Sequence, residues 1–160
     1  MKDIYDTLEF NQVKNLISEY CVSMMAKELI VSLKPIEDYD DLLLQQQYLD
    51  QAMQLIYHYG RLPLAPFDDV EPLLKKANKD GTLLGQELLA IVYLLNNVKE
   101  VKEYLEDKDF DGQELLQLCQ QLVLPRQLLA NINHCIDSSG NVVDNASSKL
   151  KQLRRQILNL

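Results

Sequence analysis

Residues 84–105 read LGQELLAIVYLLNNVKEVKEYL, and this stretch sets the fold class of the chain. Apolar side chains recur in it at positions 88, 91, 95, 98 and 105. Spacings of three and four residues place them on one face of a helix about 30 Å long. Neither Gly nor Pro occurs between residues 86 and 105, so we predict one continuous helix with a buried face.

Helical patterns continue on both sides of this stretch. Four of the expected helix starts have a side chain that can accept hydrogen bonds from free backbone N–H groups. These N-cap positions are Asn11, Ser23, Asp38 and either Asp68 or Asp69. Gly60 is the expected end of the long helix that Asp38 begins. Two shorter helices are predicted at 113–122 and 127–136, after an acidic loop at 106–112.

Composition supports an all-α chain. The 160 residues include only five Gly and five Pro, and 47% are apolar, enough for a globular core. The net charge of −8 argues against a freestanding nucleic-acid-binding domain, because binding phosphates requires clustered Lys and Arg. The three cysteines, at 21, 119 and 135, lie among apolar residues, so we expect thiols in a reducing cytoplasm. No apolar run approaches the roughly 20 residues of a membrane span, and we expect no membrane partner.

Residues 136–147 read IDSSGNVVDNAS and predict a tight reversal of the chain. Gly140, between Ser139 and Asn141, supplies the positive φ that a short β-hairpin needs. Asn145 or Ser147 can cap the helix that follows. That helix runs to residue 160 without a closing cap, so we expect this chain to be part of a longer protein. We predict an irregular multi-helix core at 1–145, with one short hairpin, and an outgoing helix at 146–160.

The outgoing helix has a basic face and an apolar face. Lys151, Arg154 and Arg155 share one side, and Lys149 is nearby. The opposite side carries the stripe Leu150, Leu153, Ile157 and Leu160. Two interpretations stay open: a solvated face, or a coiled-coil arm whose polar face meets an acidic partner. The candidate interaction or junction residues are Asp137, Gly140, Asp144, Lys151, Arg154 and Arg155.

Patterns for catalysis and metal binding are incomplete. Residues 107–112 open like a calcium loop, but Glu114 and Leu118 stand where an apolar residue and a bidentate Glu are needed. Cys119, His134 and Cys135 lack the paired spacing of zinc ligands. No glycine-rich phosphate loop occurs. We therefore predict no catalytic residue, no cofactor and no metal site in this chain.

Several sequence blocks, in order, resemble one known family. They are Leu8-Glu9-Phe10; Gly60-Arg61-Leu62-Pro63-Leu64; 69–77, DVEPLLKKA; 81–89, GTLLGQELL; and the segment from Ile136-Asp137 through Asp144 to Arg154-Arg155-Gln156-Ile157. Together they resemble the N-terminal part of a bacterial MutS paralogue, the endonuclease MutS of the second type, which carries a C-terminal small-MutS-related nuclease domain.

The resemblance implies a mechanical role. The chain would be the helical core up to the first turns of a lever, an outgoing helix that leads to a clamp. Beyond Leu160 would lie the clamp, an ATPase that uses ATP and Mg, and the nuclease, and the whole protein would form a homodimer. Such proteins are expected to suppress homologous recombination through branched DNA, or to split collided ribosomes, mainly through regions beyond Leu160.

Within this interpretation the chain itself is not an enzyme. Its partners are the clamp and ATPase domains of its own protein, and the reversal at 137–147 transmits movement to the lever. The alternative from another class is a freestanding helical protein-interaction module with no nucleic-acid role. In that case the apolar stripe of 84–105, or that of 150–160, would bind a partner helix.

Overall fold

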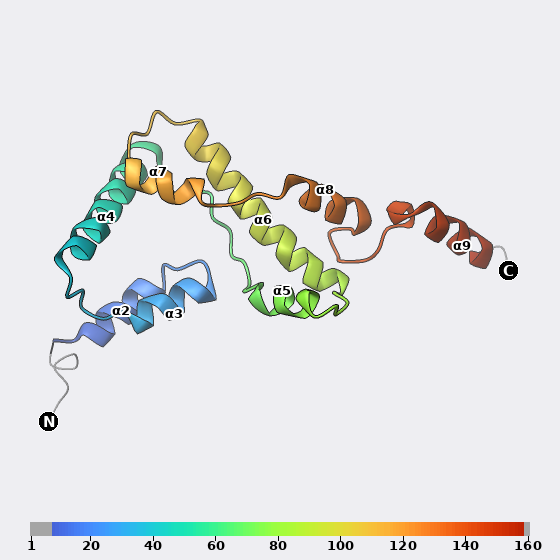
Figure 1. Cartoon of the computed structure of the whole chain (residues 1–160), viewed down its shortest axis with the longest axis horizontal. Helices are drawn as coiled ribbons and strands as arrows, with labels where there is room; N and C mark the ends of the chain where they lie inside the picture. Colours follow the sequence, from blue (N-terminus) through green and yellow to red (C-terminus); the bar gives the residue numbers. More distant parts are fainter. Residues whose placement is uncertain (1–7, 159–160) are drawn as a thin grey trace, which may run out of the picture. The chain divides into compact units, whose positions relative to one another are not determined.

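The computed structural model describes residues 8–158, which fold into α-helices without a β-sheet (Figure 1). In chain order these are α2 (Phe10–Ser18), α3 (Met24–Ser32), α4 (Tyr39–Tyr59), α5 (Glu71–Asn78), α6 (Gly85–Glu106), α7 (Gln113–Gln120), α8 (Arg126–Cys135) and α9 (Ser148–Leu158). A 3-10 turn, η1 (Asp144–Ala146), precedes α9. The all-α prediction is confirmed. Leu160, the last residue of the predicted apolar stripe, lies outside the described residues.

Helix ends follow the predicted capping residues at three positions. The Ser23 hydroxyl accepts a hydrogen bond from the Ala26 N–H at 3.2 Å and begins α3. The Asp38 carboxylate accepts from two backbone N–H groups of the first turn of α4, at 2.9 and 3.0 Å. Gly60 ends α4 with a φ of 87°. These ends agree with the sequence because capping depends on residues within one turn of the boundary.

Two predicted helix starts are wrong. Asn11 lies inside α2, which begins at Phe10 after Glu9 adopts a left-handed φ of 56°. Helix α5 begins after Val70, one residue later than an N-cap at Asp69 would place it. Val70 is buried in the hydrophobic core, so packing of its apolar side chain helps to hold the start of α5 in place.

The chain divides into two compact units, and α6 contributes to both. The described part of the first unit comprises residues 8–69 and 100–122, and that of the second comprises residues 70–99 and 123–158. The boundary that the sequence suggested near residue 145 is a different division and stays a prediction.

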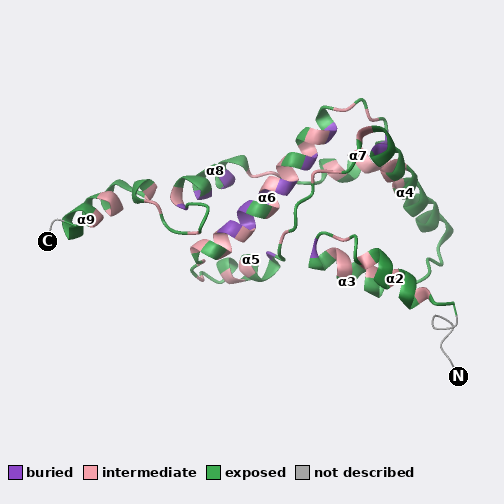
Figure 2. Cartoon of the chain, turned by 180° about the vertical axis from the view of Figure 1, so that it is seen from behind, coloured by how far each residue is buried: buried purple, intermediate pink, exposed green. Residues whose placement is uncertain are grey.

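The first unit has a small core where α4, α6 and α7 meet. Leu55, Val101 and Leu105 are buried there, and Leu55 is only 1% exposed. The amide oxygen of Gln51 accepts a hydrogen bond from the Leu115 N–H at 2.9 Å and joins α4 to α7. The Tyr104 hydroxyl donates to the Tyr59 carbonyl at 2.8 Å. Away from this end α4 is largely exposed, as Figure 2 shows.

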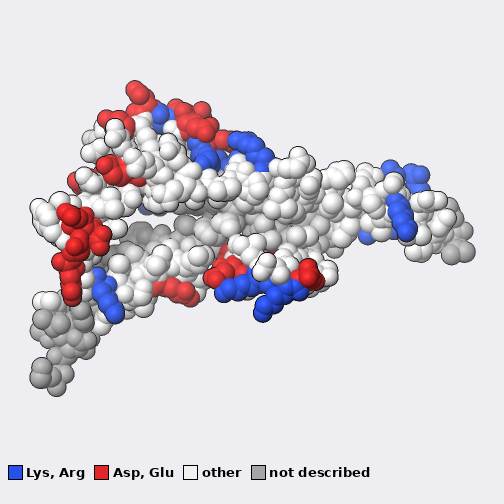
Figure 3. Space-filling view, viewed as in Figure 1, with Lys and Arg blue, Asp and Glu red and all other residues white. Residues whose placement is uncertain are grey.

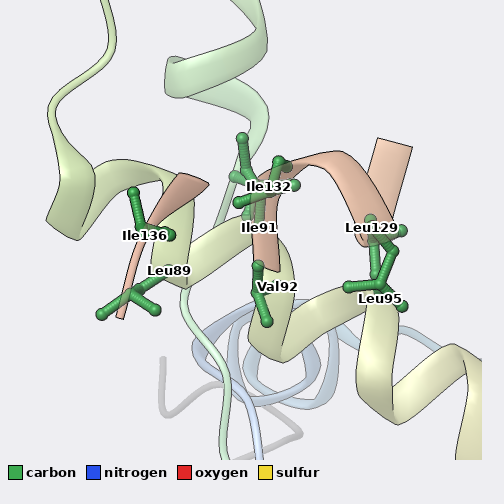
Figure 4. Packing of buried hydrophobic residues seen from close by; sticks show 8 residues of the cluster. Leu89, Ile91, Val92, Leu95, Leu129, Ile132 and Ile136 are labelled. Atoms are coloured by element: carbon green, nitrogen blue, oxygen red, sulfur yellow. The ribbon is translucent and has the colours of Figure 1, made fainter. Parts of the chain in front are cut away.

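The second unit is built on the N-terminal half of α6 packed against α8. Figure 4 shows Leu95 beside Leu129 and Ile91 beside Ile132. Ile91 and Leu95 of the predicted stripe are buried in this core, Leu88 and Val98 are half-buried, and Leu105 belongs to the core of the first unit. The buried face is wider than the predicted stripe, because Leu89 and Val92 also lie in this core.

The predicted hairpin at 136–144 takes the form of a loop. Ile136 and Val142 form an isolated antiparallel bridge, and neither residue belongs to a strand in the described chain. A second cross-loop bond runs from the Val143 N–H to the Cys135 carbonyl at 3.0 Å. The reversal is therefore in the predicted place, but without the paired strands of a hairpin.

Candidate functional site

The loop at 137–141 is organised around the carboxylate of Asp137. Its Oδ1 accepts hydrogen bonds from the N–H groups of Ser139 at 2.8 Å and Asn141 at 2.9 Å. The Asp137 N–H donates to the Asn141 carbonyl at 2.9 Å and closes the loop. The side chain thus takes two N–H groups that would otherwise be available to a strand ladder, which explains why a loop replaces the hairpin.

These bonds lower the pKa of Asp137 below its ordinary value of 3.8. The bond from the Asn141 N–H has the largest effect and that from the Ser139 N–H the next, because both stabilise the charged form. A carboxyl group with a depressed pKa in the folded state stabilises the fold above its ordinary pKa. That contribution is lost as the pH falls through the lower pKa of the folded state.

Asp137→Asn should therefore lower the melting temperature at neutral pH, and the difference from the parent chain should shrink as the pH falls below about 4. The amide oxygen keeps a weaker acceptor in place, so the loop is loosened but not abolished. Thermal unfolding followed by circular dichroism at several pH values measures this. Asp50→Asn, on the exposed surface of α4, is the control. A difference for Asp137→Asn that is equal at neutral and strongly acidic pH would contradict the assignment.

The loop docks on the beginning of α6 through two glycines. A Cβ atom added to Gly85 would lie 2.8 Å from the carbonyl carbon of Gly140 and closer still to its oxygen. Gly140 has a φ of 74°, and a Cβ there would lie 2.9 Å from the side-chain nitrogen of Gln86. The Gln86 side chain in turn donates to the Ser139 carbonyl at 2.6 Å. Only glycine at both positions allows this backbone-to-backbone approach.

The same end of α6 is tied to α5. The Glu87 carboxylate accepts a hydrogen bond from the Leu84 N–H at 2.6 Å, as the third helical residue does in a capping box. The Lys76 ammonium donates to both Glu87 oxygens at 2.8 Å. These contacts lower the pKa of Glu87, with Lys76 as the largest cause and Leu84 as the second. The first turn of α6 is therefore held from two sides, by the loop and by α5.

Helix α9 is connected to the loop through Arg154. Its guanidinium donates to the Val142 carbonyl at 2.9 Å and forms an ion pair with Asp144, the first residue of η1. The Ser147 hydroxyl accepts from the Leu150 N–H at 3.1 Å, so Ser147 rather than Asn145 caps α9. The ion pair is partly exposed and of a kind typically worth about 0–1 kcal/mol. Its role is to orient α9 against η1 more than to add stability.

The six candidate residues thus belong to one region of the second unit but divide into groups. Asp137 and Gly140 shape the loop, while Asp144 and Arg154 form a pair that joins η1 to α9. On α9, Arg155 is exposed and Lys151 is half-buried. Because Arg154 is used within the chain, the three basic residues do not form a single outward-facing set.

Sequence reasoning missed Gly85, Gln86 and Glu87 as parts of this junction. For Glu87 the signal was partial, because Leu84 has no side-chain acceptor and only the acidic residue in the first turn of the helix could be noticed. For Gly85 the signal was a glycine in the first turn of an otherwise uninterrupted helix, which often marks a close approach of another backbone.

The junction holds oriented backbone, the two ion pairs Lys76–Glu87 and Arg154–Asp144, and a short helix, so what it can do is transmit or resist movement. Among residues 8–158, no group of three His, Cys, Asp or Glu side chains is placed to hold a metal ion. None of the helices within these residues has both the length and the apolar character needed to span a bilayer. The three cysteines are free thiols, and partial burial raises the pKa of Cys119.

No model of a known protein family matches this chain. The endonuclease MutS2 of Lactobacillus johnsonii is 31% identical over 160 residues, which cover 96% of this chain and 20% of that protein. The endonuclease MutS2 of Bacillus cereus is 32% identical over 153 residues, or 94% of this chain and 20% of that protein. For the protein of the same name from Finegoldia magna, the identity is 29% over 157 residues, again 96% and 20%.

The chain therefore spans about a fifth of the length of these curated relatives. Identity near 30% extends over nearly the whole of this chain, and not over one short motif. The chain is homologous to a segment of the MutS2 endonucleases.

Proposed function

We propose that this chain is the non-catalytic core and lever base of a MutS-like clamp ATPase that acts on branched DNA, on collided ribosomes, or on both. The observation that carries this proposal is the homology to one fifth of the MutS2 endonucleases. In this proposal ATP, Mg and the nuclease belong to the remaining parts of such a protein, which works as a cytoplasmic homodimer. This chain supplies the mechanical connection between those remaining parts of the protein and the lever.

The geometry of the second unit supports a mechanical role. The first turn of α6 is held by the Gly85–Gly140 approach and by Lys76, and α9 is oriented by Arg154. A displacement of α6 therefore moves the loop, and the loop moves the start of α9. In this proposal α9 is the first part of the lever, and the loop from Asp137 to Ser147 is its base.

The test uses the protein encoded by the whole reading frame. Arg154→Ala removes both contacts that orient α9, and we expect ATP hydrolysis to be retained while the ATP-dependent change in affinity for the clamped substrate is reduced. Branched DNA and collided ribosomes are measured in parallel. Arg155→Ala is the matched control, since it removes the same charge from an exposed position one residue away. Equal effects of the two variants on coupling would contradict the role of the junction.

The 160-residue chain alone should bind neither ATP nor duplex or branched DNA appreciably. The physical reasons are its net charge of −8 and the lack of a glycine-rich phosphate loop in its sequence. Titration with labelled ATP and with a labelled four-way junction at low salt measures this. Sub-micromolar binding to either ligand would contradict the proposal that other parts of the protein hold nucleotide and nucleic acid.

A freestanding protein-interaction module is the second candidate, and exposed apolar side chains on α4 favour it. Leu49, Met53 and Ile56 lie along this helix and are 61%, 60% and 51% exposed. Such a stripe on a folded chain commonly marks an interface. Sequencing the gene beyond codon 160 distinguishes the two functions. A phosphate-loop motif downstream supports the clamp ATPase, and a stop codon directly after codon 160 supports the module.

A further inference from the structure

The first unit contains an open apolar pocket of about 460 Å³ between the end of α4, the following linker, α6 and α7. Its floor is the buried set Leu55, Val101 and Leu105. Its rim carries Leu64, Leu118 and Leu122, which are 40%, 45% and 39% exposed. The volume lies in the range of about 300–1,000 Å³ that is typical of ligand pockets.

The lining suits apolar side chains better than a small polar ligand. Cys119 and Gln121 are its only members with polar side-chain atoms. Every buried side-chain nitrogen and oxygen in the described chain already has a hydrogen-bond partner, so the exposed amide of Gln121 is the one side-chain N or O group of this lining that could orient a small molecule. A ligand site usually provides a few such groups. A row of Leu or Ile side chains from a helix needs none.

Acidic residues dominate the chain around this pocket. Residues 100–122 include seven Asp or Glu and only two Lys. The ammonium group of Lys102 is occupied by the carbonyls of Cys119 and Leu122, at 3.2 and 2.8 Å, where it caps the end of α7. That of Lys108 lies over the Tyr104 ring, 5.2 Å from its centroid. The segment that supplies most of the lining is therefore acidic overall, and this net charge favours a positively charged partner.

The two units of the chain carry opposite net charges. The described part of the first unit has 17 acidic and 6 basic residues, a net charge of −11. That of the second unit has 5 acidic and 9 basic residues, a net charge of +4. Figure 3 shows Lys and Arg without Asp or Glu on the visible face of α9. The excess of positive charge is greatest on α9, whose residues 148–158 include four basic and no acidic side chains.

Helix α9 also presents apolar side chains that the second unit does not cover. Leu153, Ile157 and Leu158 are 46%, 69% and 84% exposed. Leu153 and Ile157 are four residues apart and share one face of the helix. Helix α9 thus carries an apolar ridge with basic residues beside it. These features complement the apolar pocket and the negative net charge of the first unit.

We propose that α9 of one copy of this chain docks its Leu153–Ile157 ridge into the α4–α6–α7 pocket of a second copy. Direct pairing of two α9 helices is disfavoured, because it would bring together two segments that each carry four positive charges and no negative charge. Docking into the acidic first unit replaces this repulsion with attraction. Where both copies dock in this way, the dimer has twofold symmetry and two equal contacts.

The experiment measures self-association of the 160-residue chain by light scattering and sedimentation over a hundredfold dilution. Leu118→Glu alters the rim of the pocket, and Leu153→Glu with Ile157→Glu alters the ridge. Both sets of positions are exposed, so the fold should survive, and circular dichroism verifies this. Each variant should weaken self-association about tenfold or more. Leu128→Glu is the matched control: this residue of α8 is 48% exposed and lies outside both surfaces.

Mixing the two variants separates this interface from the alternatives. The Leu118→Glu chain keeps an intact ridge and the Leu153→Glu, Ile157→Glu chain keeps an intact pocket, so the mixture should form a heterodimer through one contact. Higher salt should weaken this contact because the charges of pocket and ridge are opposite. A chain that stays monomeric at all concentrations overturns the proposal. So does a double ridge variant that associates as tightly as the parent, or a mixture that forms no heterodimer.

Discussion

Gly85→Ala should lower the free energy of unfolding by about 3 kcal/mol, although alanine usually stabilises a helix relative to glycine. The added Cβ would overlap the backbone of Gly140, and a backbone carbonyl cannot rotate away as a side chain can. The loop must instead move off the end of α6, and the bond between Gln86 and the Ser139 carbonyl is then lost. Overpacking typically costs about 1–3 kcal/mol, and the lost bond adds about 1 kcal/mol. Together they exceed the gain in helix propensity of up to about 1 kcal/mol.

Chemical denaturation followed by circular dichroism measures this effect. Gln86→Ala is the control, because it removes the same hydrogen bond without adding an atom to the interface, and it should cost only about 1 kcal/mol. The double variant Gly85→Ala, Gly140→Ala should cost less than the sum of its single variants, since the loop can be displaced only once. A stabilising Gly85→Ala would mean that the loop does not rest on α6.

Leu55→Ala should destabilise the first unit by a comparable amount, about 3 kcal/mol, within the range of about 2–5 kcal/mol for buried leucines. Leu55 is the most deeply buried leucine of the described chain and lies between α4, α6 and α7. Its removal extends a pocket that already opens to solvent. The side chains around this open pocket can therefore relax into part of the new space, which keeps the cost away from the upper end of that range.

Leu64→Ala is the matched control for Leu55→Ala. It shortens another leucine of the same pocket, but at a position that is 40% exposed, and should cost less than about 1 kcal/mol. Hydrogen exchange adds a spatial readout: Leu55→Ala should reduce amide protection mainly in α4 and α7. Equal costs for the two substitutions would show that the floor of the pocket is not a packed core.

The sequence by itself determined those features that depend on residues close together in the chain. The caps at Ser23 and Asp38, the end at Gly60 and the uninterrupted course of α6 depend on residues within a turn or two of one another. The apolar face of α6 could be predicted for the same reason, because helical periodicity fixes which side chains point the same way. The resemblance to MutS paralogues also came from local blocks, and the comparison supports homology to a segment of them.

What only the tertiary structure decided depends on residues far apart in the chain. Gly85 and Gly140 are each ordinary turn or helix-end glycines until the fold brings their backbones together. By its spacing, Arg154 belongs to the basic face of α9. In the structure its guanidinium binds Asp144 and the Val142 carbonyl of the same chain and is not available to a partner in the same way as Arg155. The pocket above Leu55 arises where three helices meet. Such contacts depend on how whole elements pack, and periodicity within one element carries no information about them.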